Sequence, residues 1–240
     1  MADRHLDWDG CFNVRDLGGL PAARGRVTRR GALVCADSLA GLTAAGWEAL
    51  RAHGVRTVVD LRNDDEVAAG DAAPRPDGVA TVPVPLDGVE DTEFWATWAS
   101  GPQFGTPLYY GPFLERAPER TARAVAAIAR ARPGGVAVHC VGGRDRTGLV
   151  SIVVLALLGV APEIVAADYA LSARRLPARH AALRSTDDGP VLDAFLADRG
   201  TTAAALVVDL LERLDVEALL QVRGGLTPHD IAALRARLLA

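Results

Sequence analysis

Short apolar runs alternate with longer amphipathic segments along the chain. Val55–Leu61 is rich in β-branched residues and lies between Gly54 and a polar run, which predicts a short buried strand. Val79–Leu86 predicts a second strand, and its prolines at 83 and 85 favour the edge of a sheet or a strand end. Val136–His139 predicts a third, very short strand. Strands spread among helices in this way indicate the α/β class.

The helices are indicated by their caps and by their apolar runs. Thr43 is a suitable N-cap for a helix that starts beside it. Ala117–Arg132 is an Ala-rich segment that ends at Pro-Gly-Gly. Leu149–Val160 is an apolar run of 12 residues, too short to cross a bilayer, so it predicts a buried helix. Residues 161–240 are predicted to be helical, with the last helix capped by Thr227.

Two segments have no clear periodicity. Residues 3–43 are rich in Gly and Arg and predict irregular structure. Residues 91–110 are aromatic and are interrupted by prolines and glycines. We expect this second segment to form a short helix and a loop that pack on the core, because large aromatic side chains are usually buried. The alternative is a wall or lid over a functional site.

Composition narrows the functional class. The chain has 240 residues, of which 50% are hydrophobic and 23% are charged, so we expect one domain that spans residues 1–240. A net charge of −4 argues against nucleic-acid binding. Three cysteines without a Cys-x-x-Cys pair exclude a disulfide scaffold and a Cys-rich zinc module. The first ten residues contain no signal-peptide core, so a cytoplasmic location is the default expectation, and export without a cleavable signal stays open.

The chemistry is concentrated in residues 139–148, which read HCVGGRDRTG. A strand ends, Cys140 follows, and after five further residues Arg146 precedes an apolar helix. Two adjacent glycines let the backbone N–H groups turn inward and form an anion nest, to which a helix from Thr147 adds its amides and dipole. Arg146 offers a planar fork for two phosphoryl oxygens. The same positive field should stabilise Cys140 as a thiolate nucleophile facing a bound phosphorus.

This pattern resembles the signature of the protein tyrosine phosphatase superfamily, which is His-Cys, five residues, Arg, then Ser or Thr. The nearer resemblance is to the atypical bacterial and fungal branch, which includes secreted mycobacterial phosphatases of phosphoproteins and phosphoinositides. Three motifs carry it: Asn-x-Arg-Asp-Leu-Gly-Gly at 13–19, Asp-Leu-Arg at 60–62 and Asp-Arg-Thr-Gly at 145–148. The branch usually has Ala-Gly-Lys before the last motif, where this chain has Gly142, Gly143 and Arg144.

The resemblance implies a tyrosine phosphatase-like fold, with a small, mostly parallel central sheet flanked by helices and a helical C-terminal part. It implies phosphomonoester hydrolysis through a phosphocysteine at Cys140, with Arg146 as the phosphate clamp. We expect no metal or cofactor, because Arg146, the loop amides and the helix end can neutralise the phosphate. The residues expected to bind the phosphate are Val141, Gly142, Gly143, Arg144 and Thr147. Thr147 is also expected to hydrogen-bond the Cys140 sulfur.

The proton donor for the leaving group has two candidates. Asp145 lies beside Arg146 in the loop, and we favour it as the general acid. Asp87, after the second predicted strand, is the alternative. His139 is expected to support the geometry of the loop. Asp60 is either a supporting group or a surface charge at a strand end, and the motif at 13–19 is expected to tie the N-terminal segment to the loop.

The expected substrate is a phosphorylated protein, with a phosphoinositide as a further possibility, and inorganic phosphate is the expected product. We expect no nucleic-acid partner, no stable membrane insertion and a monomer. A rhodanese-like sulfurtransferase also cradles a catalytic cysteine, but it gives no reason for Arg146. A non-catalytic phosphate-recognition module would be expected to lack Cys140 or Arg146. Cys11 and Cys35 are expected to be inert, and redox partnership with Cys140 is the alternative.

Overall fold

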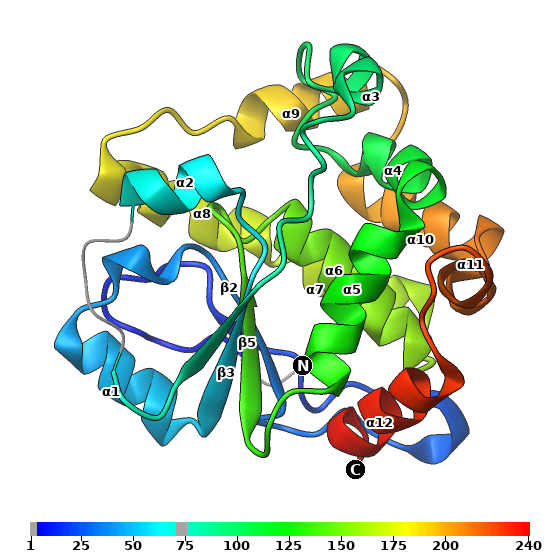
Figure 1. The fold of residues 1–240 in the computed structure, drawn as a ribbon. Helices are drawn as coiled ribbons and strands as arrows, with labels where there is room; N and C mark the ends of the chain where they lie inside the picture. The colour runs from blue at the N-terminus through cyan, green and yellow to red at the C-terminus, as the bar shows by residue number, and fades with distance from the viewer. Residues whose placement is uncertain (1–3, 71–75) are drawn as a thin grey trace.

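The computed structural model describes residues 4–70 and 76–240, and a five-stranded sheet lies at its centre (Figure 1). The strand order is β1-β2-β5-β3-β4; β1 is antiparallel to β2, and the other neighbours are parallel. The strands are β1 (Arg15–Asp16), β2 (Leu33–Ala36), β3 (Val55–Asp60), β4 (Ala80–Pro83) and β5 (Gly135–His139). The predicted α/β class and mostly parallel sheet are confirmed.

Helices cover both faces of the sheet. They are α1 (Ala44–Ala52), α2 (Asp64–Gly70), α3 (Thr92–Trp98), α4 (Tyr110–Arg116), α5 (Pro118–Ala129), α6 (Arg146–Leu157), α7 (Pro162–Ala170), α8 (Ser172–Leu183), α9 (Gly189–Ala197), α10 (Ala203–Arg213), α11 (Val216–Val222) and α12 (Pro228–Leu238), with short 3-10 turns η1 (Ala23–Gly25), η2 (Leu39–Gly41) and η3 (Pro107–Tyr109). Val58 and Ala137 pack on the α1 side, whereas Val59 and Val138 pack with α5 and α6. Because successive strand residues point to opposite faces, strands covered on both sides are largely apolar, and the polar residues Asp60 and His139 lie at the strand ends.

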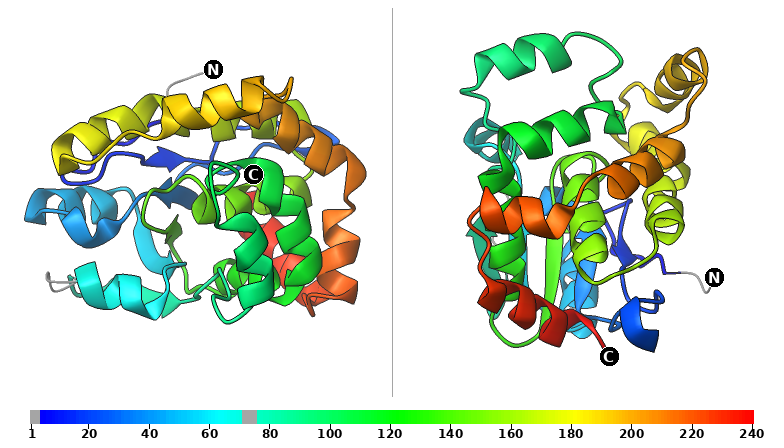
Figure 2. Two further views of the ribbon diagram at one scale, coloured as in Figure 1. Left: turned by 90° about the horizontal axis from the view of Figure 1, so that it is seen from above. Right: turned by 90° about the vertical axis from the view of Figure 1, so that its right-hand side faces the viewer.

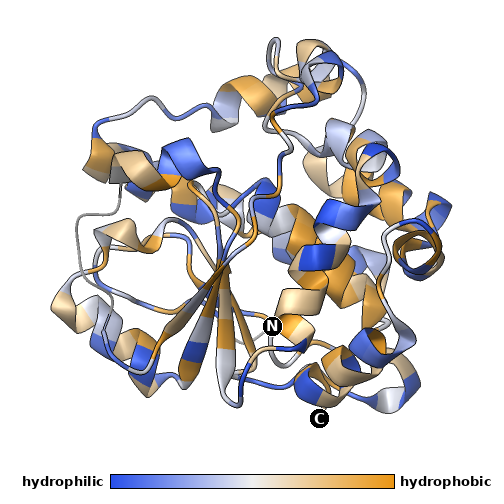
Figure 3. Cartoon of the chain, in the orientation of Figure 1, coloured by the Kyte–Doolittle hydropathy of each residue, from blue (hydrophilic) through white to orange (hydrophobic). Residues whose placement is uncertain are grey.

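Helix α6 is buried on nearly every side, which explains the uninterrupted apolar run in its sequence. It contacts β2 and β5 on one side and α5, α7 and α11 on others. The C-terminal helices form an outer layer, in which α10 packs on α7 and α12 packs on α5 (Figure 2). Figure 3 shows both hydrophilic and hydrophobic residues along α5, as expected for a helix with one face on the core. The helical prediction for residues 161–240 is confirmed, and Thr227 forms a capping box with Asp230.

Several predicted elements need correction. The segment at 3–43 is not wholly irregular, because it supplies β1 and β2, and β2 lies inside the sheet beside β5. Four apolar residues among glycines and arginines are too short a run to identify a strand. The second predicted strand is shorter than Val79–Leu86, but β4 does lie at the sheet edge, as its prolines indicated. The polar run after β3 contains the start of α2, which was not predicted.

Three parallel strands end at the same place and define the position of the site. In the strand registers His139 pairs with Ala36 on one side and with Asp60 on the other. The loop that begins at Cys140 therefore emerges between the ends of β2 and β3. Figure 1 shows α2, α3 and α9 on this side of the sheet. Within residues 4–70 and 76–240, no helix combines the length and the apolar character needed to cross a bilayer.

Candidate active site

The loop after β5 folds around the sulfur of Cys140. Cys140 is 2% exposed, and its Sγ accepts a hydrogen bond from the backbone N–H of Gly143 at 3.3 Å. Gly143 has a φ of +69°, and a Cβ at this position would lie 2.7 Å from the carbonyl oxygen of Ala36. Only glycine fits there without moving the backbone, so Gly143 is required for the turn that aims its N–H at the sulfur.

The outer side of the loop is held by the N-terminal part of the chain. Ser38 donates its backbone N–H to the carbonyl of Val141 at 3.0 Å. The buried Asn13 donates its side-chain N–H to the carbonyl of Gly142 at 3.2 Å. Arg15 instead donates to Asp168 of α7 at 3.0 Å, so it ties the N-terminal segment to a helix and not to the loop. The motif at 13–19 thus supports the loop through its first residue.

A buried polar network lies beneath the loop. His139 donates from Nδ1 to the carbonyl oxygen of Cys140 at 3.1 Å, and its Nε2 lies 3.4 Å from Asp60. Asp60 also accepts from the Arg62 guanidinium, with Nη2 and Oδ2 2.7 Å apart. Burial opposes ionisation of Asp60, but the hydrogen bonds from His139 and Arg62 outweigh it and hold the pKa of the carboxyl well below its usual range. Asp60 and Arg62 are each 3% exposed, so the surface-charge alternative is wrong.

Two carboxylates, those of Glu66 and Asp87, hold the guanidinium of Arg146. Its Nη1 and Nη2 donate to the two carboxylate oxygens of Glu66, at 2.5 and 2.7 Å. The Nη1 atom also lies 3.1 Å from Oδ2 of Asp87. Burial opposes ionisation of Glu66, but hydrogen bonds from Arg146 and from the Asn63 backbone lower its pKa below the usual value. This bidentate contact fixes the plane of the guanidinium.

Sequence reasoning missed Glu66, although a local signal was present. Asn63 is followed three residues later by Glu66, and the backbone N–H of Asn63 donates to the Glu66 carboxylate at 2.8 Å. This is the reciprocal half of a capping box, which marks the start of a helix. The signal could have predicted α2. It could not have paired Glu66 with Arg146, which lies 80 residues later.

A cavity of about 550 Å³ opens in front of Cys140 and Arg146. Its aromatic wall consists of Trp95, Phe104 and Tyr109. The Trp95 indole N–H donates to the carbonyl oxygens of Asp87 and Gly88, both at 3.1 Å. Residues 91–110 therefore pack on the core as predicted, and they also form the wall that the alternative described.

Both candidate acids line this cavity. Burial raises the pKa of Asp87 above its usual value, although Arg146 and the Asn63 side chain oppose the shift. Asp145 lies one residue before α6, and its carboxylate accepts a 3.5 Å hydrogen bond from the Tyr110 hydroxyl. The fold thus brings two carboxylates 58 positions apart in the sequence to one cavity.

Two phosphate-loop residues lie differently from expectation. The Thr147 hydroxyl donates to the carbonyl of Ala36 at 3.5 Å, and not to the Cys140 sulfur. This contact joins α6 to β2. Arg144 lines a second cavity and not the cavity at Cys140, and its guanidinium donates to both carboxylate oxygens of Asp188, at 3.0 and 3.1 Å. Val141 and Gly142 line the cavity at Cys140, which we propose as the catalytic cavity.

The other two cysteines are buried away from solvent. Burial, reinforced by the neighbouring Asp37, raises the pKa of Cys11 well above its usual value. Burial also raises the pKa of Cys35 to about 11. Since the thiolate is the reactive form, both environments favour the inert interpretation over redox partnership.

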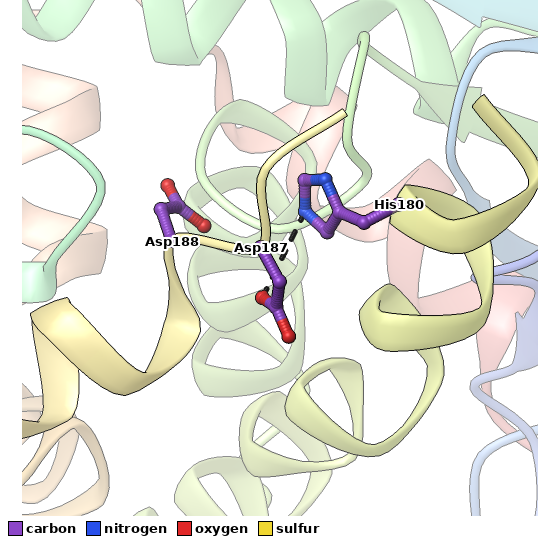
Figure 4. A group of neighbouring side chains, drawn as sticks. All are labelled: His180, Asp187 and Asp188. Atoms are coloured by element: carbon purple, nitrogen blue, oxygen red, sulfur yellow. Dashed lines mark ion pairs between the residues drawn. The ribbon is translucent and has the colours of Figure 1, made fainter. Parts of the chain in front are cut away.

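Within the described part of the chain, one group of side chains has the spacing of metal ligands. His180, Asp187 and Asp188 have ligand atoms within 4.8 Å of one another. Figure 4 shows the Asp187 carboxylate turned toward His180, with the two groups joined as an ion pair. Both oxygens of Asp188 already accept from Arg144. The positive guanidinium bound to Asp188 repels a cation, so the residues do not fit a metal centre.

Comparison with known proteins agrees with this geometry. The pattern of the tyrosine phosphatase family matches residues 6–240. A protein of Cupriavidus necator named as a tyrosine-protein phosphatase is 35% identical over 185 residues, which cover 72% of this chain and 64% of that protein. A tyrosine-protein phosphatase of Nostoc commune is 31% identical over 65% of this chain and 53% of its own length.

A third relative covers more of both chains. The triple specificity protein phosphatase PtpB of Mycobacterium tuberculosis is 29% identical over 226 residues, which are 82% of this chain and 74% of that protein. The matched part of this chain thus spans about half to three quarters of the length of these relatives. Because the family pattern extends over nearly the whole sequence, the chain belongs to the tyrosine phosphatase family.

Proposed function

We propose that this chain is a cysteine-dependent phosphatase that hydrolyses phosphomonoesters through a phosphocysteine at Cys140. One observation carries the proposal: the Cys140 sulfur, an inward-pointing loop amide and the Arg146 fork meet at one cavity. These are a nucleophile, an anion nest and a two-oxygen clamp, which together are what phosphoryl transfer requires. Membership of the tyrosine phosphatase family supports the same reaction.

In the first step the Cys140 thiolate attacks phosphorus. The S–P bond forms while the bond from phosphorus to the ester oxygen breaks, and Asp145 donates a proton to the departing oxygen. In the second step water attacks the phosphocysteine, Asp145 takes a proton from that water, and the S–P bond breaks to release inorganic phosphate. Asp87 is the alternative acid, because burial raises its pKa and so favours the protonated form.

Arg146 supplies most of the charge neutralisation in both steps. Its fork would bind two equatorial phosphoryl oxygens, and these contacts shorten as charge develops in the transition state. Glu66 holds the guanidinium from one edge, and this leaves the N–H groups of the other edge for phosphate. No metal or cofactor enters this mechanism.

The aromatic wall favours phosphotyrosine as the first substrate class. Trp95, Phe104 and Tyr109 offer flat apolar surfaces to an aryl ring, and edge or stacked contacts of this kind stabilise aromatic pairs. The mycobacterial relative is named for triple specificity, which supports including phosphoserine peptides and phosphoinositides among the candidates. We propose a phosphorylated protein as the physiological partner.

The decisive experiment measures turnover of an aryl phosphate by two variants. Cys140→Ser should abolish turnover and leave vanadate binding largely intact, because a hydroxyl is a far weaker nucleophile. Arg146→Lys should lower kcat by orders of magnitude although the charge is kept, because a point charge cannot replace the fork. More than about a tenth of the activity remaining in Cys140→Ser would rule out the covalent route. Cyanide consumption with thiosulfate would instead indicate the sulfurtransferase.

A further inference from the structure

A second cavity lies beside the catalytic one, and the phosphate loop contributes to both. The second cavity has a volume of about 360 Å³ and is lined by parts of α8 and α9, the start of α10, and residues 105–107. Its walls are largely apolar, with Leu176, Leu192 and Leu196 among them. Arg144 lines this cavity, whereas the next residue, Asp145, lines the catalytic cavity. Adjacent residues of one loop therefore face different cavities.

The position of Arg144 is determined by Asp188. This aspartate lies in the connection between α8 and α9, directly before α9, and it receives both terminal nitrogens of the Arg144 guanidinium. The Nε atom of Arg144 lies 3.4 Å from the carboxylate of Asp145. Gly105 makes room for this arrangement, because a Cβ there would lie 2.9 Å from Nη2 of Arg144. The hydrogen bonds from Arg144 lower the pKa of Asp188, so this carboxylate is ionised at neutral pH.

Another anion can replace Asp188 as the partner of Arg144. The side chain of Asp188 is 50% exposed and that of Arg144 is 16% exposed. An ion pair with one partner this exposed contributes little net stability, so a competing anion can replace it. Arg144 already touches Asp145, whose carboxylate faces the catalytic cavity, and rotation of its side-chain torsions would redirect the fork toward that cavity. Asp188 therefore biases the Arg144 guanidinium toward the second cavity.

On the basis of the proposed phosphatase function, we propose that Asp188 is a specificity-determining residue that acts by positioning Arg144. It holds the guanidinium in the second cavity, and so it favours substrates whose only anionic group near the reaction is the phosphate to be removed. When Asp188 is neutral, Arg144 is released and binds a second anionic group that flanks the scissile phosphate.

The test compares two esters with similar leaving groups, phenyl phosphate and 3-carboxyphenyl phosphate. For each variant the readout is the ratio of kcat/KM for the carboxylated ester to that for the plain ester. Asp188→Asn should raise this ratio about two- to fivefold, the range expected for a partly exposed ion pair. Asp187→Asn is the matched control, because it removes the same charge from the neighbouring residue, which lines the second cavity, and it should leave the ratio unchanged.

A double variant isolates the route through Arg144. Adding Arg144→Gln to Asp188→Asn should return the ratio to the original value or below it. An equal rise in Asp187→Asn, or a rise that survives in the double variant, would show a general charge effect and overturn the proposal. Asp188 makes no side-chain cap to α9, so Asn fits its position, and Asp188→Ser provides a second variant if folding is impaired.

The outcome for Asp188 is separable from the outcome for the phosphatase function. If the unmodified chain hydrolyses neither ester, or if Cys140→Ser keeps its turnover, the phosphatase function is wrong. If the unmodified chain hydrolyses phenyl phosphate and the ratio does not move in Asp188→Asn, only the role of Asp188 is wrong.

Discussion

Replacing Glu66 by Gln should separate the orientation of Arg146 from the charge of the cavity. The substitution keeps the size of the side chain and one acceptor oxygen, but it places an amide N–H₂ where the second oxygen accepted from the guanidinium. One of the two contacts, at 2.5 and 2.7 Å, is therefore lost. We expect the Arg146 fork to tilt out of the plane required for two-oxygen binding.

The expected magnitude follows from the burial of this contact. The side chains of Glu66 and Arg146 are 27% and 13% exposed, so the interaction is only partly screened by solvent. A hydrogen bond to a charged group contributes about 1.5–3 kcal/mol. If the loss is felt fully in the transition state, kcat/KM should fall about 10- to 100-fold, since each 1.36 kcal/mol corresponds to a factor of about ten.

The assay is turnover of an aryl phosphate at neutral pH, with Asp65→Asn as the matched control. Asp65 neighbours Glu66 in α2 and lines the same cavity, so its variant removes the same charge. We expect Asp65→Asn to change kcat less than about threefold, as for an exposed charge. Equal losses in the two variants would refute the orientation argument and show that only the net charge of the cavity matters.

Three further predictions concern the acid, the loop and the buried network. Asp145→Asn should slow phosphotyrosine hydrolysis far more than hydrolysis of an activated aryl phosphate, because protonation matters most for basic leaving groups. Its phosphate affinity should be unchanged. If this leaving-group dependence occurs only in Asp87→Asn, Asp87 is the acid. Gly143→Ala should abolish vanadate binding. Gly142→Ala should leave the free energy of unfolding unchanged or raise it by about 0.4–1 kcal/mol in chemical denaturation, since a Cβ at Gly142 meets no atom within 4 Å. Asp60→Asn should lower the free energy of unfolding by about 3–5 kcal/mol, because it removes the charged acceptor from a buried ion pair with Arg62. The lowered pKa of Asp60 means that its contribution is complete above the unfolded pKa of about 3.9 and is lost as pH falls below it, so the acid limb of the stability profile should flatten in Asp60→Asn.

Local sequence was sufficient to predict the loop and to propose Cys140 as nucleophile and Arg146 as phosphate clamp. Cys140 and Arg146 lie on one short loop between a strand and a helix, and the relation between them depends only on backbone geometry over five residues. The buried helix α6 could also be predicted from the sequence, since an apolar run of this length is too short to cross a membrane and too long for a typical strand. These features could be predicted because the interactions that create them join residues that are close in the sequence.

The partners of these residues were decided by the tertiary structure. Glu66 reaches Arg146 from α2, and Asp188 reaches Arg144 from the connection before α9. Strand β2 could be recognised only through its neighbours, because four residues carry too little pattern.

These partners could not be predicted because an ion pair forms only where tertiary packing brings two side chains together, and the sequence around either residue does not specify the other. The chain has 30 acidic and 26 basic residues, and only packing decides which carboxylate faces which guanidinium. The sequence alone therefore led to the proposal of Cys140 as the reacting group and Arg146 as the phosphate clamp. The orientation of the Arg146 guanidinium, the burial of Asp60 and the position of Arg144 in the second cavity follow from which elements the sheet and its helices bring together.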